Sequence, residues 1–188
     1  GSLFDTGSFG YTNGLTKKIW IAPKSTAQAD VMAHEWTHTV HYWIYEESPL
    51  SWPDGTPGKE EYAATNEALA YYYACRAIAD RYYRDAAHVP GSDFSITDID
   101  TGDVVDDNGV RTGQVVKDHW SDFDPTQNAN TNSWILATAL WDVVKAGLPA
   151  GGGTGSWPVN VDPNSTNLNH FDGILWDALT QRAPKTFA

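Results

Sequence analysis

The sequence predicts a single α+β domain with a small N-terminal sheet and a mainly helical second half. Residues 8–24 resemble a β-hairpin, because Asn13-Gly14 favours a tight turn and Lys18–Ile21 suits an edge strand that ends before Pro23. Long stretches with helical spacing of apolar residues follow. The 188 residues are enough for one hydrophobic core, so we expect residues 1–188 to form one domain.

The hairpin is expected to lead into a capped helix. Ser25 or Thr26 can cap this helix, with Gln28 placed as in a capping box, and the pattern runs to about Tyr45. A loop rich in proline and glycine follows at 49–58. The remaining expected elements are a helix from about Glu60 to Ala86, short strands at 102–105 and 113–116 around an Asn108-Gly109 turn, a helix from Asn132 to Ala146, a flexible loop at 150–167 and a helix from His170 to Arg182.

Composition and charge exclude several classes of function. The chain has 24 acidic and 12 basic residues, and its net charge of -12 repels nucleic acid and anionic membranes. No segment approaches the roughly 18 consecutive apolar residues of a membrane span. The single cysteine, Cys75, rules out an internal disulfide. We therefore expect neither a nucleic-acid nor a membrane partner.

The most informative motif is HEWTH at residues 34–38. On a helix, His34 and His38 lie one turn apart on the same face, so both can bind one metal ion. Zinc readily accepts imidazole nitrogen, and a catalytic site uses three protein ligands and leaves a position for water. Glu35, beside the first histidine, can reach that water as a general base.

Two further stretches resemble the gluzincin metallopeptidases, which include fungalysin-like and thermolysin-like enzymes. The pair HEWTH and NEALA is similar to their zinc-binding motifs, and TNSWILATALWDV at 131–143 is similar to a helix that follows their active site. The resemblance covers roughly residues 19–145. It implies a zincin-like fold, Zn²⁺ as cofactor, and Glu67 as the third ligand beside His34 and His38.

The same resemblance implies hydrolysis of peptide bonds in peptides or proteins, with Glu35 as base. An endopeptidase fits an edge strand such as 18–21, to which an extended substrate can add. The family also implies a secreted or cell-surface location, with flanking domains or a pro-segment. Gly1-Ser2 has the form of a cloning remnant. The last residues, Thr186-Phe187-Ala188, resemble a segment after which the family's sequence continues, so we expect the natural chain to extend beyond 188.

Two positions depart from the family pattern. Tyr71 stands where an aspartate commonly orients a zinc-bound histidine, and Asn130 stands where a histidine often stabilises the oxyanion. Another donor should replace that histidine. We predict Tyr62 or His119, and favour Tyr62 because it lies five residues before Glu67 on the same expected helix.

Other interpretations remain open at this stage. A zinc-bound but catalytically inactive binding or adhesion module would explain Tyr71 and Asn130, although Glu35 argues against it. An unrelated helical interaction domain would require all three motifs to arise by chance. His41 could complete a three-histidine site, but the metzincin pattern would need glycine there and histidine at Ile44.

Several remaining residues have structural interpretations. The acidic stretch 98–107 could bind calcium, but it lacks the EF-hand order of ligands and is better read as a solvated loop. We expect at least one of the tyrosines at 71–73 to pack in the core. The same holds for the apolar stripe of the helix at 132–146, which consists of Trp134, Leu136, Leu140 and Trp141.

Overall fold

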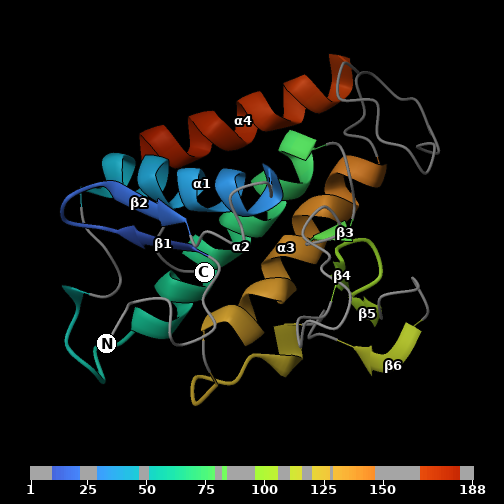
Figure 1. The fold of residues 1–188 in the computed structure, drawn as a ribbon, viewed down its shortest axis with the longest axis horizontal. Helices are drawn as coiled ribbons and strands as arrows, with labels where there is room; N and C mark the ends of the chain where they lie inside the picture. Colours follow the sequence, from blue (N-terminus) through green and yellow to red (C-terminus); the bar gives the residue numbers. More distant parts are fainter. Residues whose placement is uncertain are drawn as a thin grey trace.

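The computed structural model is an α+β arrangement of helices and two small antiparallel sheets (Figure 1). It describes residues 10–21, 29–46, 51–78, 82–83, 96–105, 111–115, 120–127, 129–146 and 166–182. The α+β prediction is confirmed at this level. The second half is less purely helical than expected, because the larger sheet precedes its helices in the chain.

The predicted hairpin is present. Strand β1 (Gly10–Asn13) pairs antiparallel with β2 (Lys18–Ile21), and Tyr11 lies opposite Trp20. The connection is a four-residue loop rather than a two-residue Asn-Gly turn, because Asn13 is itself the last paired residue. The Asn13 Oδ1 atom accepts hydrogen bonds from the backbone N–H groups of Leu15 and Thr16, which fixes the loop.

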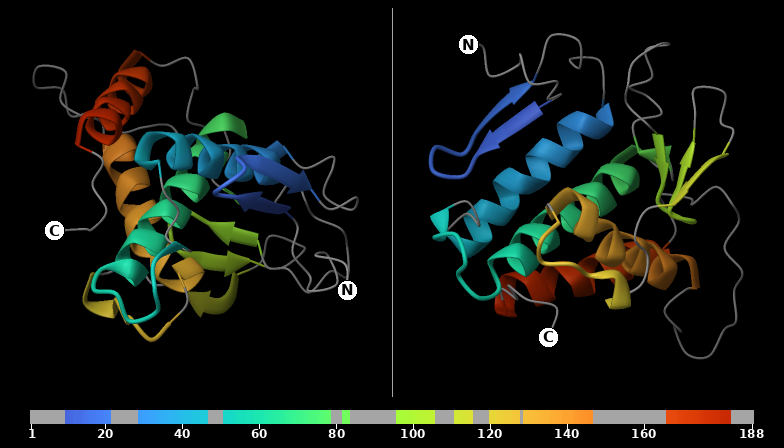
Figure 2. Two further views of the ribbon diagram at one scale, coloured as in Figure 1. Left: turned by 90° about the vertical axis from the view of Figure 1, so that its left-hand side faces the viewer. Right: turned by 90° about the horizontal axis from the view of Figure 1, so that it is seen from below.

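Helices α1 (Ala29–Tyr45) and α2 (Lys59–Ile78) pack against each other, and the hairpin lies along α1 (Figures 1 and 2). The prediction that the second helix continues to Ala86 was wrong. Tyr82–Tyr83 forms strand β3, in which Tyr82 pairs with Asp98. Aromatic residues favour strands, and here tertiary pairing prevails over the local helical pattern.

A four-stranded antiparallel sheet has the order β3-β4-β5-β6, with β4 (Ile96–Asp98), β5 (Asp103–Val105) and β6 (Arg111–Val115). Asp98 ends β4 and Asp103 begins β5, while Asp100 lies in the turn between these two strands. Asp98 and Asp103 are 2% and 9% exposed, so the prediction of a solvated loop is wrong for these two residues. The Asn108-Gly109 turn lies outside the described residues.

A short 3-10 helix (Trp120–Asp122) precedes α3 (Ala129–Ala146), and α4 (Thr166–Arg182) is the last element. Both long helices begin earlier than expected, α3 by three residues and α4 by four. The expected cap at 25–28, the loop segment 150–165 and His119 lie outside the described residues. Among the described helices, none is long and apolar enough to cross a bilayer.

The core lies between α2 and α3. Tyr72 is fully buried there, and Tyr71 stacks on Trp134 with 4.4 Å between ring centroids. Trp134 and Trp141 are buried, while Leu136 and Leu140 pack partly buried against them. The predicted core roles of the tyrosines and of the α3 stripe are therefore confirmed.

Candidate metal centre

The two histidines of the HEWTH motif lie on the face of α1 that meets α2. His34 and His38 are 7% and 5% exposed, and their rings meet edge to face with centroids 4.6 Å apart. The i, i+4 spacing on one helix brings their Nε2 atoms to 3.0 Å. The rings therefore converge on one point between the helices.

Glu67 of α2 completes this cluster from the opposite side. Its Oε2 atom lies 3.3 Å from His34 Nε2, and its Oε1 atom lies 3.4 Å from His38 Nε2. The carboxylate side chain is 23% exposed, so the cluster is open to solvent on the glutamate side. Within the described parts of the chain, this is the group of three that could hold a metal ion.

The spacing of the three ligands fits zinc. Ligand atoms about 2.05 Å from a tetrahedral zinc lie about 3.3 Å from each other, and the separations here are 3.0, 3.3 and 3.4 Å. Two imidazole nitrogens and one carboxylate oxygen form a known catalytic zinc set, with one position left for water. The residues present therefore fit the ion that the sequence implied.

Burial and mutual attraction shift the pKa values of the two histidines and the glutamate in this cluster. Burial lowers the pKa of His34. Burial acts in the same direction on His38, but the adjacent Glu67 carboxylate outweighs it and raises the pKa of His38 to about 9. Burial would raise the pKa of Glu67, but the charge on His38 and hydrogen bonds from the two histidines lower it. The protonated His38 and the Glu67 carboxylate therefore attract each other across the helix interface.

Glu35 faces the hairpin rather than α2. The Thr12 hydroxyl lies 2.5 Å from Glu35 Oε2 and 2.9 Å from its backbone oxygen. A Cβ atom on Gly10 would come within 2.7 Å of Glu35 Cγ and Oε1, so only glycine allows β1 to approach this closely. The sequence does not predict these contacts of Thr12 and Gly10, because nothing local marks a contact with a residue 23 or 25 positions away.

The two departures from the family pattern lie together beside the cluster. The Tyr71 ring packs against His34 with centroids 4.7 Å apart. The Tyr71 hydroxyl donates a hydrogen bond to Asn130 Oδ1 at 3.2 Å. The Nδ1 atoms of His34 and His38 have no hydrogen-bond partner among the described residues. Tyr71 therefore supports His34 by ring packing and not through a hydrogen bond.

The structure places Tyr62 and His41 in an aromatic group at one end of the α1–α2 interface. Tyr62 is fully buried, with its ring against His41, Tyr45 and Trp52. His41 Nδ1 hydrogen-bonds to the Oδ1 atom of Asn66, and burial lowers the pKa of His41 to about 3. His41 is not a member of the metal-binding group, whose third residue is Glu67. The oxyanion roles of Tyr62 and His119 stay predictions.

Comparisons with known proteins add nothing to this geometry. No protein-family model, curated protein or solved structure matches the chain.

We predict that Glu67→Ala abolishes stoichiometric zinc binding. Loss of a ligand should weaken zinc affinity by more than the ~10- to 100-fold typical of an outer hydrogen-bond partner. Elemental analysis and competition with a chromophoric chelator measure this. The matched control is Glu61→Ala, a glutamate in the first turns of the same helix. Equal zinc content in both variants would remove Glu67 from the site.

We also predict that stabilisation by zinc increases with pH. In the metal-free protein, His38 has its pKa raised from 6.5 to about 9. Its ion pair with Glu67 stabilises the fold fully below pH 6.5 and is lost as the pH rises through 9. Zinc must displace this proton, so apparent affinity should rise by up to about tenfold per pH unit across this window. Melting temperatures with and without zinc should diverge from pH 6.5 to 9, and a constant difference would contradict the prediction.

Proposed function

We propose that this protein is a zinc-dependent peptidase of the gluzincin type with a zincin-like fold. The observation that carries the proposal is the triangle of His34, His38 and Glu67, whose separations match a tetrahedral zinc site. The neighbouring Glu35 supports a catalytic rather than a structural role. A structural zinc usually takes a fourth protein ligand and needs no base.

Zinc bound at this centre would supply Lewis acidity, which lowers the pKa of water toward neutrality and polarises a carbonyl. His34, His38 and Glu67 would hold the ion from two different helices. Glu35 would accept a proton from the attacking water and return it to the leaving amine. A general base must be held within hydrogen-bond reach of the water it deprotonates, and the Thr12 hydroxyl, 2.5 Å from Glu35 Oε2, restrains this carboxylate.

The hairpin offers a place for an extended substrate. We assign this role to β1 instead of the strand at 18–21 that the sequence favours, because β1 contacts Glu35 through Gly10 and Thr12. A two-stranded sheet leaves the outer edge of β1 without a partner strand within the described residues. A peptide added there as a third strand would run past the metal centre, which favours cleavage within a chain.

The second candidate function is a zinc-bound module without catalysis. The Nδ1 atoms of both histidines have no hydrogen-bond partner in the described part of the chain. Partners at these atoms normally orient zinc ligands and raise their basicity. This observation favours weak zinc binding or an inactive centre. The two functions differ in what loss of Glu35 does, because only the peptidase needs its base.

We predict that Glu35→Gln retains zinc and fold but loses peptide hydrolysis. The amide keeps the shape of the side chain and removes the base, which is worth roughly 10²- to 10⁴-fold in rate. Turnover of a denatured protein substrate and zinc content should be measured on the same samples. Glu60→Gln, an acidic residue in the first turn of α2, is the control. An inactive parent protein would leave the binding module as the function, whereas full activity in Glu35→Gln would remove Glu35 as the base.

A second prediction identifies the group that stabilises the oxyanion. The sequence predicts Tyr62 or His119, with the shorter Asn130 amide as a weaker donor, and the contact of Tyr71 with both His34 and Asn130 adds Tyr71. Loss of one such donor costs roughly 10²- to 10³-fold in kcat. The four variants to compare are Tyr62→Phe, Tyr71→Phe, His119→Ala and Asn130→Ala. The donor is the residue whose variant keeps zinc and loses kcat, and an undiminished kcat in all four would refute the proposal of a side-chain donor.

A further inference from the structure

One nitrogen of the His34 ring has no hydrogen bond to hold it. Nε2 lies 3.3 Å from Oε2 of Glu67, whereas Nδ1 is buried and has no hydrogen-bond partner among the described residues. A histidine that binds a metal usually donates its second ring N–H to a carboxylate or a carbonyl, and this bond fixes the orientation of the ring. In His34, another kind of contact is needed to restrict rotation of the ring.

Two tyrosine rings from different elements form an aromatic corner against the His34 ring. Tyr71 of α2 and Tyr83 of β3 have ring centroids 4.7 and 5.6 Å from that of His34. The two tyrosine rings meet each other at 73°, with centroids 4.8 Å apart. Aromatic rings attract one another in such tilted and edge arrangements at centroid distances of roughly 4.5–7 Å. Tyr71, Tyr83 and His34 are 6%, 4% and 7% exposed, so the three rings pack together largely out of contact with water.

The aromatic corner is itself held by neighbouring elements. Trp134 of α3 stacks on Tyr71, with 4.4 Å between centroids and 14° between ring planes. Asn130 accepts a hydrogen bond from the Tyr71 hydroxyl. Tyr83 is fixed by the antiparallel pairing of β3 with β4. Because both rings are restrained independently of α1, they can limit the motion of a side chain that α1 carries.

We propose that Tyr83 is a positioning residue of the metal centre. Together with Tyr71 it holds the His34 ring so that Nε2 faces the ion, which is the task that a hydrogen bond at Nδ1 performs in other metal sites. The proposal rests on the proposed function, because it takes His34 to be a metal ligand. Tyr83 is then the contribution of the four-stranded sheet to a centre whose ligands come from α1 and α2.

Tyr83→Leu should weaken zinc binding roughly 2- to 10-fold, which is the worth of an aromatic pair expressed as a ratio of affinities. Tyr83→Phe should bind zinc as tightly as the parent protein, since it keeps the ring. Competition with a chromophoric chelator measures these affinities on the full chain. Tyr71→Leu removes the other ring of the aromatic corner and should act in the same direction, so the test does not depend on the folding of one variant.

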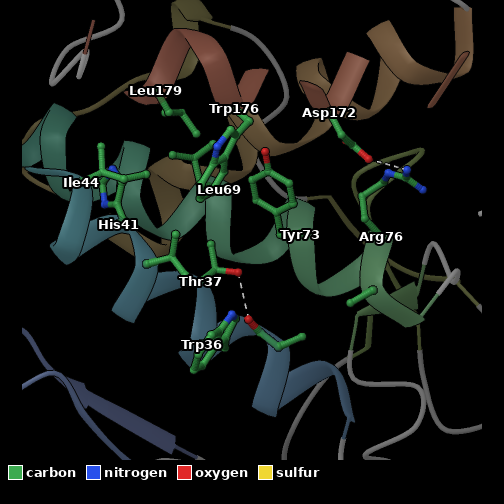
Figure 3. A pocket seen from close by; sticks show the side chains of 13 residues that line it. Trp36, Thr37, His41, Ile44, Leu69, Tyr73, Arg76, Asp172, Trp176 and Leu179 are labelled. Carbon is green, nitrogen blue, oxygen red and sulfur yellow. Dashed lines mark hydrogen bonds and ion pairs between the residues drawn. The ribbon is translucent and has the colours of Figure 1, made fainter. Parts of the chain in front are cut away.

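The absorption spectrum of bound Co²⁺ separates positioning from a purely structural role, because its d–d bands depend on the arrangement of the ligands. These bands should change in Tyr83→Leu but not in two control variants, Tyr73→Leu and Trp141→Leu. Tyr73 lines a cavity between α1, α2 and α4 (Figure 3). Trp141 belongs to the same buried cluster as Tyr83. Within the described residues, neither control side chain makes a ring contact with His34.

Two results would overturn the inference and leave the proposed function intact. One is a zinc affinity of Tyr83→Leu equal to that of Tyr73→Leu. The other is a loss in Tyr83→Phe as large as in Tyr83→Leu, which would assign the effect to the hydroxyl group. Nuclear Overhauser effects between the ring protons of His34 and Tyr83 test the contact in the metal-free parent, and their absence would also overturn it. A parent that binds neither Zn²⁺ nor Co²⁺ would refute the proposed function, and the role of Tyr83 toward a metal with it.

Discussion

The packing of α1 against α2 is the constraint on which the rest of the structure depends. The motif on α1 supplies two imidazoles, and the candidate metal centre is complete only because α2 brings Glu67 to 3.3 and 3.4 Å from their nitrogens. Asn66 fixes this register by hydrogen bonds to His41 and Tyr42. A slide of one helical turn, about 5.4 Å, would separate the ligands completely. The geometry of the centre is therefore a property of the helix interface.

The central position of α2 explains how this helix can hold Glu67 in place relative to α1. One face holds Glu67 toward α1, while another packs Tyr72 into the core with α3. Tyr72 also donates a hydrogen bond to Asp172 at 2.7 Å, and Arg76 pairs with the same carboxylate, which ties α4 to α2. Because densely packed interiors resist small displacements, the core limits how far Glu67 can move relative to α1.

The sequence could predict the secondary structure that depends on interactions between residues close together in the chain. His34 and His38 share a face because they lie four residues apart on one helix. The predicted end of that helix, Tyr45, is also the last residue of α1. What failed depends on distant partners. Strand β3 exists because Tyr82 meets Asp98, and Thr12 reaches Glu35 only after the hairpin docks on α1. Glu67 was found through family resemblance, since its contact with His34 spans 33 positions and two helices.

His41 links two parts of the α1–α2 interface. Its Nδ1 atom hydrogen-bonds to Oδ1 of Asn66, the residue directly before Glu67. Its ring packs against Tyr45 and Tyr62, with centroids 4.1 and 5.8 Å away. Asn66 is fixed to the backbone that also carries Glu67. The packing of this aromatic group therefore bears on the position of the third residue of the candidate metal centre, and it acts through the same α1–α2 interface.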